Sequence, residues 1–165
     1  MKTLAAIALT AITVAGPFAA RAQGLIDKGM VAGWNVMVDP QMGNGCLIQT
    51  IFEDLSVVRL GYDATHNRGY FVVFDKDWGQ IKEGGTYPIT FDLDGETFNA
   101  TATGFRMDRV PGAGVFFDDR AFIDAIAQKH TMTVFNSAGT PVIAIDLAGS
   151  AKALEYARKC QAAEG

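Results

Sequence analysis

The side chains that most often carry catalysis are sparse in this chain of 165 residues, which holds two histidines, His66 and His130. His66 lies in a polar stretch typical of a turn, and His130 follows a segment with helical spacing. Neither lies in a Gly-x-Ser-x-Gly or His-x-x-x-His pattern. Because hydrolase triads and zinc sites depend on histidine, the sequence assigns no catalytic residue and predicts no metal site.

Acidic residues could still do chemistry without histidine. Asp92, Asp94 and Glu96 resemble the start of a calcium-binding loop, but an EF-hand spreads its ligands over about 12 residues beside a helix. The dipeptide Asp94-Gly95 is typical of a type I′ turn, so we predict a hairpin here. A glycoside hydrolase needs only two carboxylates facing a cleft, and a carboxylate-dependent hydrolase of this kind is the alternative function.

Two arginines flank a short motif ahead of a glycine-rich segment. Arg106, Met107 and Arg109 are the candidate binding residues, because guanidinium groups offer paired donors and loops on rigid scaffolds carry function. The segment Val110–Gly114 that follows is expected to form a loop. The competing interpretation is a solvated strand end with an ion pair between arginine and aspartate, which contributes little to stability.

Aromatic side chains offer a second way to bind a ligand. Trp34 and Trp78 could stack on a bound molecule, but at strand spacing such residues more often pack in the core, and we favour the core. No sequence motif indicates a cofactor.

The N-terminus predicts export. Residues 1–22 combine a positive start, an apolar stretch too short to span a bilayer, and Ala20-Arg21-Ala22 before Gln23, as in a secretory signal peptide. In an oxidising compartment Cys46 and Cys160 are expected to form a disulfide, whereas a catalytic thiol would need a base nearby. We therefore expect residues 23–165 to form a single periplasmic or secreted domain with no transmembrane segment after cleavage.

The charge balance narrows the class of partner. The chain has 14 Lys and Arg against 18 Asp and Glu, a net charge of −4. Cleavage would remove Lys2 and Arg21 and no acid, which leaves 12 basic against 18 acidic side chains, or −6. An acidic surface repels phosphate backbones, so we expect no nucleic-acid partner. The partner would instead be an unidentified envelope or extracellular protein or a small anionic ligand.

Most of the mature chain alternates with a period of two, which predicts strands. The predicted strands are Val31–Val38, Gly45–Phe52, Ser56–Tyr62, Tyr70–Asp75, Thr86–Asp92, Glu96–Phe105, Thr131–Phe135 and Pro141–Leu147. Helical spacing predicts a helix over 119–129 and another that begins at Ser150 as N-cap and carries Cys160. The fold class is therefore mainly β, an antiparallel β-sandwich or open barrel with two late α-helices packed on it.

Several spaced motifs resemble one family. They are Gly33-Trp34-Asn35-Val36, Cys46-Leu47-Ile48-Gln49, Trp78 to Gly84, and Ile145 to Ser150 with Ala153-Leu154. In this layout the chain is similar to the invasion-associated locus B family of small exported bacterial proteins, although Met37, Val38 and Asp39 stand where that family usually has a Cys. The resemblance implies a role at a cell envelope or host surface and supplies no catalytic residues. We thus expect a noncatalytic binding or interaction protein.

Overall fold

The computed structural model describes residues 24–119 and 121–164. The predicted signal peptide, residues 1–22, lies outside the described residues. One ten-stranded sheet dominates the described chain, and all of its strand pairs are antiparallel. The strands are β1 (Ile26–Val31), β2 (Trp34–Asp39), β3 (Gly45–Ile51), β4 (Val57–Asp63), β5 (Arg68–Phe74), β6 (Thr86–Leu93), β7 (Glu96–Met107), β8 (Val110–Phe117), β9 (Thr131–Asn136) and β10 (Pro141–Asp146).

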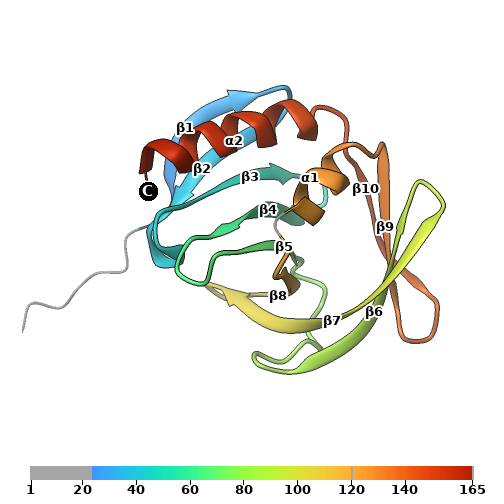
Figure 1. Ribbon diagram of the computed structural model, residues 1–165. Helices are drawn as coiled ribbons and strands as arrows, with labels where there is room; N and C mark the ends of the chain where they lie inside the picture. The colour runs from blue at the N-terminus through green and yellow to red at the C-terminus, as the bar shows by residue number, and fades with distance from the viewer. Residues whose placement is uncertain (1–23, 120, 165) are drawn as a thin grey trace, which may run out of the picture.

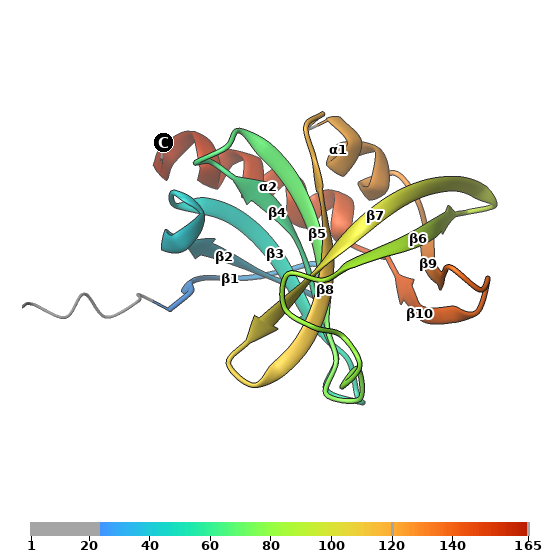
Figure 2. The same cartoon turned by 90° about the horizontal axis from the view of Figure 1, so that it is seen from below.

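The sheet is unclosed, with the strand order β1-β2-β3-β4-β5-β8-β7-β6-β9-β10. It curls strongly, as Figure 1 shows, and the hairpins β6–β7 and β9–β10 extend away from the end of the molecule that holds the C-terminus (Figure 2). The predicted mainly β class with two late helices is confirmed. Of the two architectures expected, the single curled sheet matches the open barrel.

The first predicted strand is wrong in its bounds, because Val31–Val38 spans a turn. Ala32 and Gly33 have φ values of 50° and 90°, which closes a tight hairpin between β1 and β2. Alanine rarely adopts positive φ, so the pair carries no obvious turn signal. The hairpin predicted at Asp94-Gly95 is confirmed, with φ values of 52° and 89°.

The loop expected at Val110–Gly114 is also wrong, since these residues begin strand β8. β8 lies between β5 and β7 in the sheet. A Cβ atom on Gly112 would collide with the ring of Phe74, and one on Gly114 would lie 2.8 Å from the carbonyl oxygen of Phe71. The glycines therefore allow close approach of neighbouring strands rather than a flexible loop.

Two helices pack on one side of the sheet. Helix α1 (Ala121–Ala127) contacts β5 and α2, while α2 (Ser150–Glu164) lies across β1, β2 and β3 (Figure 1). The predicted disulfide is confirmed: Cys46 on β3 is bonded to Cys160 on α2, with their Cα atoms 6.1 Å apart. None of the helices among the described residues is long and apolar enough to cross a membrane.

The expected N-cap role of Ser150 is not observed. The main-chain oxygen of Gly149 accepts the amide of Ala153 at 3.1 Å, so Gly149 occupies the cap position. The hydroxyl of Ser150 is buried and has no hydrogen-bond partner among the described residues. The start of helix α2 is buried against the first hairpin, so only glycine fits at the cap position. Ser150 is therefore the first residue of the helix and not its cap.

The apolar residues form two cores on opposite faces of the sheet. The larger core includes Trp34, Phe91 and the inward faces of both helices, and the smaller one, on the outer face, centres on Leu47, Tyr70 and Phe74. A 3-10 helix, η1 (Pro40–Met42), borders the outer face, and Met42 packs against the smaller core.

Candidate ligand-binding site

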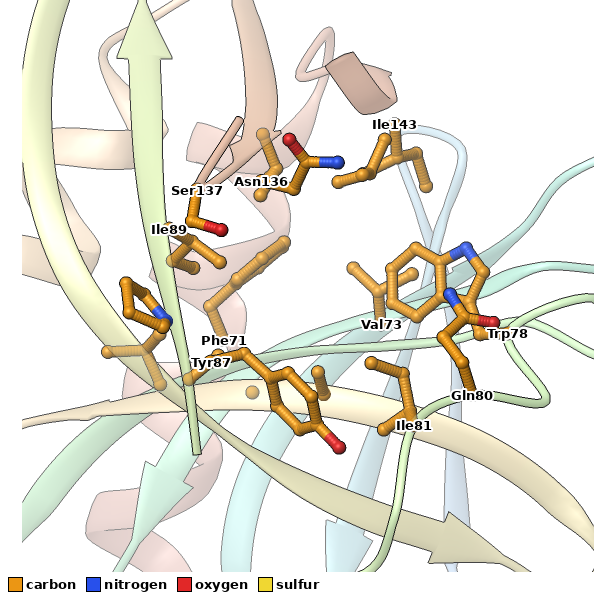
Figure 3. A pocket seen from close by; sticks show the side chains of 17 residues that line it. Phe71, Val73, Trp78, Gln80, Ile81, Tyr87, Ile89, Asn136, Ser137 and Ile143 are labelled. Atoms are coloured by element: carbon orange, nitrogen blue, oxygen red, sulfur yellow. The ribbon is translucent and has the colours of Figure 1, made fainter. Parts of the chain in front are cut away.

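A pocket of about 260 Å³ opens on the same side of the sheet as the larger core. Its walls come from strands β5 to β10 and from the loop of residues 75–85. Figure 3 shows Trp78, Gln80 and Ile81 on one side of the hollow and Ile89 and Ser137 on the other. The volume lies just below the range of about 300–1,000 Å³ usual for ligand pockets, so it suits a small ligand or part of a larger one.

The pocket walls are apolar apart from a few uncharged polar groups. Gln80, Asn136, Ser137 and the Tyr87 hydroxyl are the polar members, and among the described residues that line the pocket none is a carboxylate, lysine, arginine, histidine or cysteine. The Asn136 side-chain oxygen already accepts the amides of Ala138 and Thr140, each at 3.0 Å. The walls can therefore bind apolar groups, and among the described lining residues no histidine, lysine or carboxylate accompanies the Ser137 and Tyr87 hydroxyls as a general base.

The wall formed by residues 75–85 is held by main-chain hydrogen bonds. The amide of Ile81 donates to the carbonyl of Trp78 at 2.9 Å, which folds this part of the loop into a turn. On β7, Gly104 accepts the amide of Gly84 at 2.9 Å and donates to the carbonyl of Gly85 at 2.8 Å. A Cβ on Gly104 would collide with the carbonyl of Lys82. This contact requires glycine and fixes the loop against β7.

The two tryptophans have different roles. Trp34 is buried in the larger core, as expected, and its indole donates to the carbonyl of Ala148 at 3.0 Å. Trp78 is half-buried: it packs against the larger core and also lines the pocket. Its position in a loop with apolar neighbours such as Ile81 is the signal that could have indicated a binding wall, because loops usually hold few large apolar side chains.

The predicted binding residues lie at the β7–β8 turn, and two of them, Arg106 and Met107, line one depression on the outer face. Arg106 is exposed, and its guanidinium donates to the carbonyls of Arg109 and Ile81, both at 3.4 Å. Met107 lies on the outer face, where its sulfur accepts from Arg59 at 3.0 Å. Arg109 is exposed in the turn. Arg106 thus lies between the apolar pocket, which it contacts through the carbonyl of Ile81, and the outer face, where it lines the same depression as Met107.

A second depression, of about 550 Å³, lies on the outer face over the smaller core. Arg59 lines it, and its guanidinium donates to Gln49 at 2.7 Å and lies 5.4 Å from the centre of the Phe74 ring. Burial lowers the pKa of Arg59, although it remains cationic near neutral pH. Two carboxylates, Asp39 and Asp108, also line this depression, and Asp39 accepts the amide of Gln41 at 2.9 Å.

Each histidine contacts an aspartate near the end of a strand. His66 lies 2.8 Å from Asp63, which also accepts from Arg68 at 3.0 Å. His130 lies 3.3 Å from Asp94, which accepts the main-chain amides of His130 and Thr131, each at 2.9 Å. The Asp63 contacts lie within the β4–β5 turn, whereas Asp94 connects the β6–β7 hairpin to the start of β9 rather than forming a calcium loop. In the described part of the chain, no three His, Cys, Asp or Glu side chains cluster to hold a metal ion.

The fold and the pocket define the class: an open antiparallel β-sheet protein with a disulfide-linked helix and an apolar pocket. No protein-family model and no curated protein matches the chain. A solved structure does match: the crystal structure of invasion associated protein B from Bartonella henselae has a TM-score of 0.57 and 11% identity, covering 83% of this chain and 99% of that chain. The resemblance noted from the sequence motifs is thereby confirmed at the level of the fold.

Proposed function

We propose that this chain is an exported, noncatalytic binding protein of the cell envelope, periplasmic or secreted, that holds an apolar group in the pocket between Trp78 and Ile89. The observation that carries the proposal is the pocket itself, which is apolar and open to solvent. Each methylene transferred into such a site contributes about 0.8 kcal/mol, so a short alkyl chain or aromatic ring gains several kcal/mol before entropic losses.

Export is supported by the signal-like residues 1–22 and by the disulfide between Cys46 and Cys160, which is typical of oxidising compartments. A binding role is supported by the composition of the pocket walls, which offer shape and apolar surface but no charged side chain among the described lining residues. The distant likeness to invasion associated protein B concerns the fold alone.

The test is a fluorescence titration with N-phenyl-1-naphthylamine, an uncharged apolar probe whose emission rises in apolar surroundings. We expect saturable binding to the wild type. Ser137 lines the pocket and its neighbour Ala138 does not, although both are exposed in the β9–β10 turn. Ser137→Phe should therefore obstruct the pocket and weaken binding at least fivefold, while the matched control Ala138→Phe should bind like the wild type.

Two results would contradict the proposal. One is the absence of saturable binding by the wild type, or equal binding by the two phenylalanine variants. The other is turnover of a glycan by the purified protein, which would favour the carboxylate-dependent hydrolase and draw attention to Asp39 and Asp108 in the outer depression.

A further inference from the structure

Three exposed cations without a carboxylate partner lie close to one another in the described part of the chain. They are Lys82, Arg106 and Arg109, which we call the cationic corner. The guanidinium of Arg106 reaches the carbonyl of Arg109 and that of Ile81, the residue before Lys82. In a protein with more acidic than basic side chains, a group of cations that makes no ion pair is available for an anion.

The cationic corner adjoins the apolar pocket through two wall residues. Ile81 lines the pocket and accepts from Arg106 at 3.4 Å. Tyr87 lines the pocket as well, and its hydroxyl accepts the main-chain amide of Lys82 at 2.8 Å. Figure 3 shows Ile81 and Tyr87 next to each other at the same end of the hollow. A ligand whose apolar part fills the pocket can therefore reach the cations from this end.

Acidic neighbours reduce the charge of the corner without cancelling it. Glu83 and Asp108 flank it in sequence, are exposed, and make no ion pair among the described residues. Three cations against two anions leave a small positive excess. Because all five groups face water, the attraction for an anion is modest and is screened by salt over about 10 Å at 0.1 M.

We infer that the ligand of the pocket is a single-chain amphiphile with an anionic head: its apolar chain lies between Trp78 and Ile89, and its head lies against Lys82 and Arg106. This inference rests on the proposed binding function and adds the ligand class. The limited volume of the pocket, about 260 Å³, favours one short chain over a two-chain lipid. An alkyl carboxylate such as decanoate has both parts, whereas 1-decanol has the same chain and no charge.

The experiment measures displacement of N-phenyl-1-naphthylamine by decanoate and by 1-decanol at low ionic strength. Decanoate should bind the wild type about 3- to 10-fold more tightly than 1-decanol, and 0.5 M salt should remove most of the difference. The double variant Lys82→Gln, Arg106→Gln should lose this preference, because the affinity for decanoate should fall toward that for 1-decanol. Glu83→Gln should strengthen decanoate binding about twofold.

Lys152→Gln is the matched control, because Lys152 is an exposed cation on α2 with no ion-pair partner among the described residues, and it does not line the pocket. Shortening the chain from decanoate to octanoate removes two methylenes and should weaken binding roughly 10-fold, at about 0.8 kcal/mol each. Retained thermal unfolding midpoints would show that the variants are folded.

The outcomes separate the two proposals. Equal affinity for decanoate and 1-decanol in every variant would overturn the anionic head and leave the apolar pocket intact. Failure of both ligands and of the fluorescent probe to bind would overturn both. Binding to vesicles of phosphatidylglycerol without binding to decanoate would overturn the single-chain ligand in favour of a membrane surface.

Discussion

The indole nitrogen of Trp34 donates a hydrogen bond to the carbonyl of Ala148 at 3.0 Å, which joins the first hairpin to the segment after the last strand. Strands β1 and β10 are the two ends of the sheet and do not pair with each other. Next to this bond, a Cβ on Gly149 would collide with the carbonyl of Ala32. No strand pairing joins the two ends of the sheet. The Trp34 hydrogen bond and the close contact of Gly149 with Ala32 connect the regions beside these ends instead.

The Trp34 bond predicts a stability effect. Trp34→Phe keeps a ring in the core but removes the donor and leaves a void, so we expect a loss of about 1–3 kcal/mol in the free energy of unfolding. Urea denaturation followed by circular dichroism measures it. Trp78→Phe is the control, because Trp78 is only half-buried and lines the pocket. An equal loss in both variants would contradict a special role for the bond to Ala148.

Gly149 offers a sharper comparison, because Gly139 has a similar backbone conformation without the contact. Their φ values are 80° and 75°, and a Cβ on Gly139 would meet nothing within 4 Å. Gly139→Ala should cost about 1 kcal/mol for the positive φ alone. Gly149→Ala should cost clearly more, since the Ala32 main chain must also move. Thermal denaturation of the two variants tests this difference in stability. Similar unfolding midpoints would show that Gly149 does not pack tightly against the main chain of Ala32.

Much of the fold could be predicted from the sequence where local chemistry decides the structure. The Asp94-Gly95 turn, the β-branched run of β5 and the helical spacing of Ile123 and Ile126 each carry their own signal. The pairing of Cys46 with Cys160 followed because only two cysteines exist. These features need no knowledge of distant neighbours.

The sequence predictions are wrong or incomplete where residues distant in sequence determine the local structure. Glycines in β8 are in a strand because Phe74 and the main chain of β5 lie against them, which the local sequence cannot show. The pocket wall cannot be predicted for the same reason: Trp78 and Ile81 face Ile89 only after strands far apart in sequence curl together. Arg106 is a candidate from the sequence alone, but its contact with the carbonyl of Ile81, 25 positions away, depends on how the loop before β6 folds back onto β7.

The disulfide predicts both a mass and a stability effect. Exported protein should begin at Gln23 and gain two hydrogens on reduction, as measured by intact mass spectrometry. The bond links residues that are 114 positions apart in sequence and so restricts the unfolded chain. Reduction should therefore lower the free energy of unfolding by about 2–5 kcal/mol. The double variant Cys46→Ala, Cys160→Ala should show no response to reductant. Exported material that begins at Met1, or two freely alkylated thiols without reductant, would contradict the prediction.

Asp94 predicts a pH dependence of stability. Hydrogen bonds from the main-chain amides of His130 and Thr131 hold the pKa of Asp94 well below its usual range. A carboxylate with a lowered folded-state pKa stabilises the protein above its unfolded pKa of about 3.9, and this contribution is lost as the pH falls toward the folded-state pKa. Asp94→Asn should therefore be less stable than the wild type at pH 6, and the difference should shrink below about pH 4.

Denaturation midpoints at several pH values measure this difference. Asparagine also tolerates the positive φ at position 94, so the substitution leaves the turn acceptable. Glu53→Gln, at an exposed acid in the β3–β4 turn, is the control for the loss of one surface carboxylate and should change the stability at pH 6 by less than about 0.5 kcal/mol. A difference between Asp94→Asn and the wild type that stays constant from pH 6 to pH 3 would contradict the ionised role of Asp94.

Helix α1 is short, with seven residues, and its stability must come from packing rather than from its own hydrogen bonds. Ile126 is 1% exposed and belongs to the larger core, together with Ile123 and Leu154 from the two helices. Ile126→Ala removes buried volume and should lower the free energy of unfolding by about 2–4 kcal/mol. Leu55→Ala is the matched control, because Leu55 is 67% exposed. Urea midpoints that shift equally in the two variants would show that the α1 face does not pack against the core.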